Sequence, residues 1–119
     1  MLTDQDVQAW LDRYVEAWRT YDEAKIGALF TEDAAYRYHP WDEPVRGRDA
    51  IVAAWLADTD PPGSWRASYR PHLIAGNRAI VTGTSDYAHG ARFWNIWSLT
   101  FDDEGTVSEF AEWYMRQPG

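Results

Sequence analysis

The chain has 119 residues, with 11 Lys and Arg against 19 Asp and Glu, and a formal net charge of −8. Because no run of basic residues offsets phosphate repulsion, nucleic acid and anionic membrane surfaces are excluded as expected partners. The sequence contains no cysteine, which excludes disulfides and thiolate chemistry. It shows neither a signal peptide nor an apolar stretch of membrane-spanning length, so a cytoplasmic protein is expected. The length predicts a single domain, residues 1–119, with one core.

The first half of the sequence predicts three helices. Thr3, followed three residues later by an aspartate, is typical of a capped helix start, and apolar residues then recur at helical spacing. This spacing turns Tyr14 toward the core. Asp22 predicts the cap of a second, shorter helix that extends to residue 30, and residues 49–57 predict a third helix.

The stretch 34–47 lies between the second and third helices and has an unusual composition. It contains three aromatic residues, one histidine, two carboxylates, two arginines and two prolines. Its start predicts a short strand, which the prolines bring to an end because each lacks a backbone donor. Such a stiff loop either presents functional groups or is merely filled by its own aromatic side chains. Asp42 and Glu43 are expected to cap the loop or to pair with Arg46 or Arg48.

The second half of the sequence predicts an antiparallel sheet. From residue 65 onward the apolar residues follow a period of two, and the segments AGN, HG and DDEG supply turn residues. Four strands are predicted, near residues 66–75, 79–87, 91–101 and 106–115. The combination predicts an α+β fold, in which three N-terminal helices pack on a curved, mostly antiparallel sheet.

The last two predicted strands carry large apolar side chains on both faces. A sheet with one solvated face would alternate apolar and polar residues, and three helices cannot cover two faces. A partner chain is the simplest cover for the outer face. We therefore expect a homodimer, with Trp94, Ile96 and Trp113 near the centre of its interface.

The order of these elements, together with three stretches of sequence, resembles the nuclear transport factor 2-like superfamily and most closely its SnoaL-like members. The stretches are RYVEAWRTYDEAKIGALFTEDAAYRYHP at 13–40, VRGRDAI at 45–51 and NIWSLTFDDEGTVSEFAEWY at 95–114. The resemblance implies a cystatin-like cone that encloses a hydrophobic pocket. It does not select an activity, because this fold serves isomerases, cyclases, dehydratases, epoxide hydrolases and pure binders.

Ketosteroid isomerase, a relative within this superfamily, shows how far the resemblance extends. Its pocket uses a tyrosine on the first helix, an aspartate near the end of the first strand and a protonated aspartate on a later strand. Tyr14 matches the first position. Tyr38 or His39 takes the place of the second residue and Trp97 that of the third, so the activity itself is not implied.

The register of the last two strands predicts which residues face the pocket. Glu112 lies in the inward row between Phe110 and Tyr114, where an unpaired charge would be costly, so it requires a partner or a proton. It either carries out acid–base chemistry or pairs with an arginine such as Arg37 or Arg92. The predicted catalytic residues are Glu112, His39 and Tyr14. The predicted substrate-binding residues are Tyr38, Trp41, Trp55, Asn95, Trp97, Phe110 and Tyr114.

Two classes of function agree with this site. The first is an enzyme that carries out acid–base chemistry, such as isomerisation, cyclisation or dehydration, on a small, largely apolar neutral molecule. The second is a non-catalytic binding or dimeric assembly module. No cofactor is expected, since the sequence contains neither a phosphate-binding glycine loop nor a dinucleotide fingerprint. No metal is expected either, because His39 and His72 lack the spacing of a ligand set.

Overall fold

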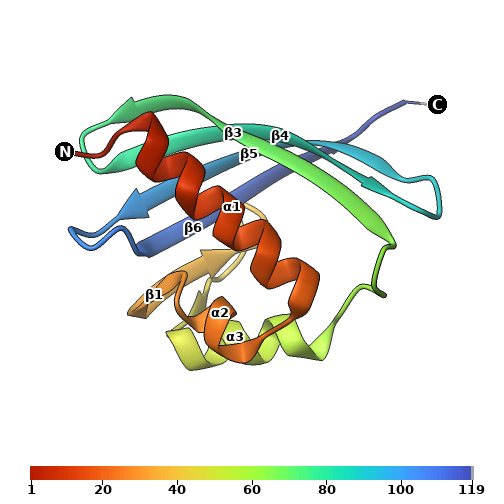
Figure 1. The fold of residues 1–119 in the computed structure, drawn as a ribbon, viewed down its shortest axis with the longest axis horizontal. Coiled ribbons are helices and arrows are strands. Elements are labelled where there is room, and N and C mark those ends of the chain that lie inside the picture. The colour runs from red at the N-terminus through yellow and green to blue at the C-terminus, as the bar shows by residue number, and fades with distance from the viewer. Residues whose placement is uncertain (119) are drawn as a thin grey trace.

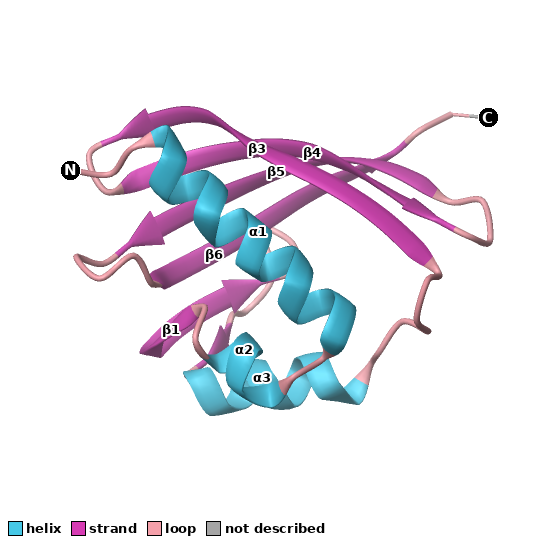
Figure 2. Ribbon diagram, viewed as in Figure 1, coloured by secondary structure: helices cyan, strands magenta, loops and turns pink. Residues whose placement is uncertain are grey.

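A computed structural model describes residues 1–118 as three helices packed against one six-stranded sheet (Figure 1, Figure 2). The helices are α1 (Asp4–Thr20), α2 (Glu23–Gly27) and α3 (Arg48–Ala57). The strands are β1 (Phe30–Arg37), β2 (Val45–Arg46), β3 (Trp65–Ala75), β4 (Arg78–Tyr87), β5 (Arg92–Phe101) and β6 (Val107–Arg116). None of the helices described is long and apolar enough to cross a membrane.

The sheet has the strand order β2-β1-β6-β5-β4-β3. Strands β3 to β6 form the predicted antiparallel meander, and β1 runs parallel to β6. In Figure 1, α1 crosses one side of the curved sheet, and α3 packs beside β1 and β2. The predicted α+β fold, with helices on a curved and mostly antiparallel sheet, is confirmed.

The starts of α1 and α2 follow the prediction. The Thr3 hydroxyl accepts a hydrogen bond from the backbone N–H of Asp6 (3.1 Å), and the Asp6 carboxylate accepts one from that of Thr3 (3.0 Å). Asp22 caps α2 by accepting from the backbone N–H of Lys25 (3.0 Å). These bonds satisfy donors that the first turn of a helix leaves free, so each cap fixes where its helix begins. Tyr14 is buried, as the helical spacing predicts.

The boundary between α2 and β1 differs from the prediction. α2 ends at Gly27 rather than at residue 30, and β1 begins at Phe30 rather than at residue 34. The Leu29 carbonyl accepts hydrogen bonds from the indole N–H of Trp10 (3.0 Å) and the backbone N–H of Val107 (3.0 Å). Because both donors belong to other elements, tertiary pairing overrides the helical pattern of this segment.

The two-residue strand β2 is a second difference, since the sequence predicts no strand there. Val45 pairs with Tyr36, and Arg46 pairs with Ala35. The backbone N–H of Gly47 also donates to the Ala34 carbonyl (2.8 Å). The stiff loop predicted after β1 is therefore the connection of a short hairpin at the edge of the sheet.

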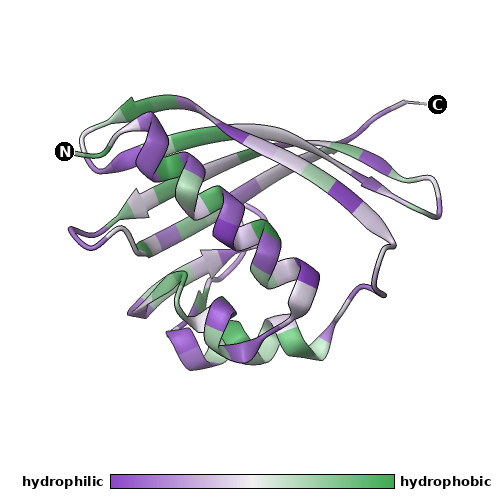
Figure 3. Cartoon of the chain, in the orientation of Figure 1, coloured by the Kyte–Doolittle hydropathy of each residue, from purple (hydrophilic) through white to green (hydrophobic). Residues whose placement is uncertain are grey.

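The core lies between the helices and the concave face of the sheet. Figure 3 shows hydrophobic residues interspersed with hydrophilic ones along α1 and the strands, as expected for elements with one buried side. The largest fully buried side chains include Trp10, Trp97, Phe30 and Phe110. His72, whose facing the sequence leaves open, is exposed at a register shift in β3.

Gly83 shapes the inner face of the sheet. It lies opposite Tyr69 on β3 and Asn95 on β5. A Cβ atom at this position would overlap the Ser68 carbonyl oxygen and the ring of Tyr69. Only glycine therefore lets the Tyr69 side chain lie across the strand, over the concave face.

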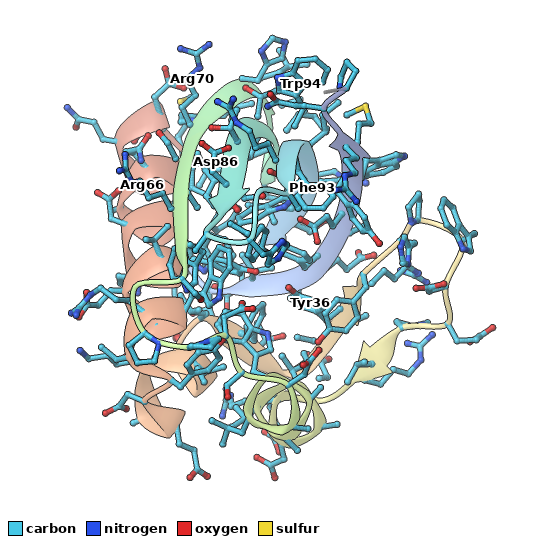
Figure 4. All side chains as sticks on the ribbon, turned by 90° about the vertical axis from the view of Figure 1, so that its right-hand side faces the viewer. Tyr36, Arg66, Arg70, Asp86, Phe93 and Trp94 are labelled. Atoms are coloured by element: carbon cyan, nitrogen blue, oxygen red, sulfur yellow. The ribbon has the colours of Figure 1, made fainter. Side chains whose placement is uncertain are left out.

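The outer face of the sheet carries large hydrophobic side chains. Trp94 is 49% exposed and Trp113 is 41% exposed, and Ile96 lies opposite Trp113 in the β5–β6 register. Figure 4 shows Trp94 and Asp86 toward the outer side of the sheet. Asp86 pairs there with Arg92 (3.5 Å) on the neighbouring strand. The homodimer interface expected at this hydrophobic patch remains a proposal.

Candidate active site

A cavity of about 490 Å³ opens between the concave face of the sheet and helices α1 and α3. Its wall is largely aromatic, and Tyr36 and Phe93, which are labelled in Figure 4, are among its lining residues. The predicted site residues that line it are Tyr14, Tyr38, Trp55, Asn95, Trp97, Glu112 and Tyr114. The fold thus brings together seven side chains from α1, α3, β5, β6 and the end of β1.

Glu112 lies half-buried in this cavity with one carboxylate oxygen held in place. Its Oε2 accepts hydrogen bonds from the indole N–H of Trp97 (2.8 Å) and from the side-chain amide of Asn95 (3.2 Å). The oxygen of that amide accepts in turn from the Ser85 hydroxyl (3.0 Å), which fixes the orientation of the amide. Within residues 1–118 no ion pair forms at Glu112, so the arginine partner that the sequence left open is not used.

Burial raises the pKa of the Glu112 carboxyl above its ordinary value. The hydrogen bonds from Trp97 and Asn95, and the nearby His39, oppose this shift because each favours the ionised form. Burial is the largest effect. A carboxyl with a raised pKa is better matched to proton transfer near neutral pH than an ordinary glutamate.

Tyr14 and Tyr36 place a pair of hydroxyl groups deep in the cavity. Their oxygens are 3.0 Å apart, and both side chains are buried. Burial first, and then neighbouring groups including Glu112, raise the pKa of both phenols well above the ordinary value. Each phenol therefore keeps its proton. Because the bond between them uses only one O–H, the other can donate to a ligand oxygen.

His39 lies at the mouth of the cavity rather than in its wall. Its Nδ1 is 2.7 Å from Oδ2 of Asp42, and its Nε2 is 2.7 Å from the hydroxyl oxygen of Tyr114. Both ring nitrogens are therefore engaged, and neither is bonded to Glu112. The contact of Asp42 with this histidine also corrects the expectation that Asp42 caps the loop or pairs with an arginine.

The sequence of residues 11–110 matches the SnoaL-like domain family over most of the chain. The chain belongs to this family. The superfamily resemblance drawn from the sequence is thereby confirmed. No significant match is found among curated proteins.

Solved structures with the same fold share little sequence with this SnoaL-like domain. A candidate ketosteroid isomerase from Kribbella flavida DSM 17836 has a TM-score of 0.73 at 20% identity, covering 98% of this chain and 82% of that one. An NTF2-like protein of unknown function from Burkholderia xenovorans LB400 has a TM-score of 0.73 at 19% identity, with 97% and 89% covered. An NTF2-like protein of unknown function from Mesorhizobium loti has a TM-score of 0.71 at 21% identity, with 94% and 93% covered. These similarities establish the fold alone.

Two predicted substrate-binding residues of the SnoaL-like domain lie outside the cavity wall. Trp41 is 78% exposed and stacks on the His39 ring with centroids 4.8 Å apart. The loop turns back toward β2 at this point, so Trp41 covers the histidine and not the cavity. Phe110 is fully buried: the Tyr36 ring stacks on it with centroids 4.2 Å apart, and the tilted Trp97 ring lies at 4.9 Å.

Several lining residues are missing from the sequence prediction. Tyr69 and Tyr87 reach the cavity from β3 and β4, whose facing the sequence did not establish. At the mouth, Asp60 accepts hydrogen bonds from the Trp18 indole N–H (3.0 Å) and the Tyr21 hydroxyl (3.4 Å), which ties the α3–β3 connection to α1. The sequence signal for the missed aromatic lining residues is the aromatic share of 16%, which exceeds what the core of a small domain needs.

The charged groups of the cavity wall are acidic. Asp58, Asp60 and Glu112 line it together with His89, and no Lys or Arg is among the lining residues that the structure describes. An acidic wall disfavours anionic ligands such as phosphate groups. Within residues 1–118, no group of three or more His, Asp or Glu side chains is arranged to hold a metal ion.

Proposed function

We propose that this SnoaL-like domain binds a small, largely apolar neutral molecule in its aromatic cavity and transfers a proton at a carbon next to a carbonyl group. Isomerisation, cyclisation and dehydration can all begin with the removal of such a proton. The observation that carries the proposal is the state of Glu112, a carboxyl with a raised pKa that is held at one oxygen inside the cavity. Membership of the SnoaL-like family supports a small-molecule site of this kind.

In this proposal, the two oxygens of Glu112 have separate tasks. Oε2 is held by Trp97 and Asn95, and these bonds keep the carboxylate form accessible despite burial. Oε1 receives no hydrogen bond from residues 1–118, so in the proposal it takes the proton from the bound molecule. Asn95 acts through Glu112 as a positioning residue.

The hydroxyl pair formed by Tyr14 and Tyr36 supplies the second requirement of this chemistry. Removal of a proton next to a carbonyl places negative charge on the carbonyl oxygen. A preorganised donor aimed at that oxygen stabilises the charge as it develops. The buried pair has one O–H available for this purpose, and the rings of Trp55 and Trp97 provide the apolar wall for the rest of the molecule.

The alternative is a non-catalytic binding or dimeric assembly module that uses the same cavity without proton transfer. The hydrophobic patch of Trp94 and Trp113 on the outer face favours this alternative, because it gives the domain a surface for assembly. A bound molecule would then raise the melting temperature of the protein without being changed by it.

An exchange experiment separates the two functions. Benzylacetone, a small apolar ketone, is incubated with the protein in heavy water, and deuterium uptake next to its carbonyl is followed by mass spectrometry. We expect the wild-type protein to accelerate uptake. Glu112→Gln keeps the shape of the side chain and should lower the rate by about 10²–10⁴-fold, the range typical of one acid–base group.

The matched control is Glu109→Gln, an exposed glutamate on the same strand, which should leave the exchange rate unchanged. A folded Glu112→Gln variant with the wild-type rate would show that Glu112 is structural. Benzylacetone that raises the melting temperature without exchanging would favour the binding module.

A further inference from the structure

Asp42, His39 and Tyr114 form a continuous chain of hydrogen bonds at the cavity mouth. Oδ2 of Asp42 lies 2.7 Å from Nδ1 of His39, and Nε2 of His39 lies 2.7 Å from the hydroxyl oxygen of Tyr114. Tyr114 lines the cavity, whereas the side chains of His39 and Asp42 are 30% and 37% exposed. The chain thus leads from the cavity to a carboxylate at the surface.

The fold itself brings these residues together. β1 and β6 run parallel, with Arg37 opposite Ala111, so both strands end at the same side of the sheet. His39 follows β1 by two residues, and Tyr114 lies three residues beyond Ala111 on β6, which places side chains 75 residues apart in sequence in direct contact. The Trp41 ring stacks on the imidazole and holds it against the tyrosine.

The hydrogen-bond partners determine which atoms of this hydrogen-bond chain carry a hydrogen. An ionised Asp42 can only accept, so Nδ1 of His39 carries a hydrogen and donates it. In the neutral imidazole Nε2 is then bare and accepts the O–H of Tyr114. When His39 takes a second proton, Nε2–H donates to the Tyr114 oxygen, and the phenol O–H is free to donate to a molecule in the cavity.

The cavity therefore presents two separate proton-transfer groups. Glu112 and Tyr114 are two residues apart on β6 and both face the cavity, with backbone positions about 7 Å apart. A molecule between them can lose a proton to one and receive a proton from the other. The buried Tyr14 and Tyr36 hydroxyls lie deeper than the exposed mouth, which orients a carbonyl group inward.

We propose that Tyr114 and His39, oriented by Asp42, act as a proton relay beside Glu112, and that the substrate is a β-hydroxy carbonyl compound from which the protein eliminates water. This inference rests on the proposed function and deepens it. Elimination of water needs a base at one carbon and an acid at the leaving hydroxyl of the next, which is the arrangement described. Tyr114 is 44% exposed, so the released water leaves directly to solvent.

In the elimination, Glu112 takes the proton from the carbon next to the carbonyl, and the C–H electrons form the new C=C bond. The C–O bond to the β-hydroxyl breaks, and the departing oxygen takes the phenol proton of Tyr114 and leaves as water. Tyr114 regains a proton from Nε2–H of protonated His39. Glu112 ends protonated and His39 neutral, and exchange with solvent returns the proton. Asp42 stays ionised and is a positioning residue.

Two probes with one carbon skeleton test the relay separately from Glu112. Benzylacetone exchange requires the base alone. The aldol of benzaldehyde and acetone, which is benzylacetone with a β-hydroxyl, also requires the acid, and its dehydration is followed by the ultraviolet absorbance of the conjugated ketone. We expect Tyr114→Phe and His39→Gln to lower the ratio of dehydration rate to exchange rate by about 10²–10⁴-fold.

The combination of both substitutions should lower this ratio no further than Tyr114→Phe alone, because the two side chains act as one unit. Glu112→Gln should lower both rates. His72→Gln, which changes an exposed histidine outside the cavity, is the control and should keep both wild-type rates.

Nitrogen-15 NMR of the imidazoles provides a readout that does not depend on activity. We expect neutral His39 to carry its hydrogen on Nδ1 in the wild-type protein and to lose this preference in Asp42→Asn. A wild-type hydrogen on Nε2 would overturn the relay. An unchanged ratio of rates in folded Tyr114→Phe would also overturn it and leave the proposed function standing. Wild-type protein without benzylacetone exchange would contradict the proposed function and the relay together.

Discussion

Glu112 experiences two opposing influences. Burial disfavours its charge, and the donors on Trp97 and Asn95 favour it, with burial the larger effect. The folded protein therefore keeps a proton on this carboxyl to a higher pH than the unfolded chain does. Between the two pKa values the folded state binds more protons, so the stabilisation from the neutral carboxyl is present at low pH and is lost as the pH rises through this range.

The wild-type protein should undergo this loss of stability, whereas Glu112→Gln should not, because glutamine cannot ionise. We expect the melting temperature of the variant, relative to wild type, to increase from about pH 4, the ordinary value for an unfolded glutamate, and to level off above the raised pKa. Thermal unfolding of both proteins at a series of pH values measures this difference in melting temperature. Glu109→Gln removes the same charge from an exposed site and corrects for the net charge of −8. A difference between the two variants that is constant with pH would contradict the raised pKa.

Within the sheet, Gly83 is the position where one added methyl group should cost most. A Cβ there would overlap the Ser68 carbonyl and the Tyr69 ring, so we expect Gly83→Ala to lower the free energy of unfolding by about 1–3 kcal/mol. Chemical denaturation measures the change. Gly27→Ala is the control, since its Cβ would meet the Arg48 side chain at an ordinary 3.6 Å. Equal stability of Gly83→Ala and wild type would show that the Tyr69 ring moves aside freely.

The regular elements could be predicted from sequence wherever a period is sustained. Strands β3 to β6 lie within one residue of their predicted ends, because their alternation is a property of each strand itself. The end of α2 and the existence of β2 could not be predicted. Both depend on pairing with β1 or β6, to which no local pattern points.

The candidate site likewise contains some residues that could be predicted from the sequence and some contacts that could not. Alternation along β5 and β6 gives the facing of Asn95, Trp97 and Glu112, so the sequence placed them on the cavity side. The position of Tyr69 depends on Gly83 and on a register shift in β3, which no alternation reveals. The contact of His39 depends on the parallel pairing of β1 with β6. Sequence reasoning therefore finds the candidate base and misses the hydrogen-bond chain beside it.

At the scale of the whole molecule, the outer hydrophobic patch predicts self-association. We expect the protein to sediment as a dimer at micromolar concentration, since Trp94, Ile96 and Trp113 form a patch of a kind that monomers rarely expose. Trp94→Glu should shift the protein to a monomer while the circular dichroism spectrum is retained. Trp41→Glu makes the same change at an exposed tryptophan on a loop and should leave the dimer intact. Wild-type protein that sediments as a monomer would contradict the interface.

The last strand of the chain, β6, lies in the interior of the sheet between β1 and β5. During synthesis, β1 and strands β3 to β5 precede β6, and the edges of β1 and β5 stay open to other chains until it has formed. Their junction closes only when β6 has been synthesised, and such long-range pairing is slow. A chain that lacks β6 would have an unjoined sheet, and it would also lack Glu112 and Tyr114. In this topology, the strand that joins the two parts of the sheet is also the strand that carries Glu112 and Tyr114.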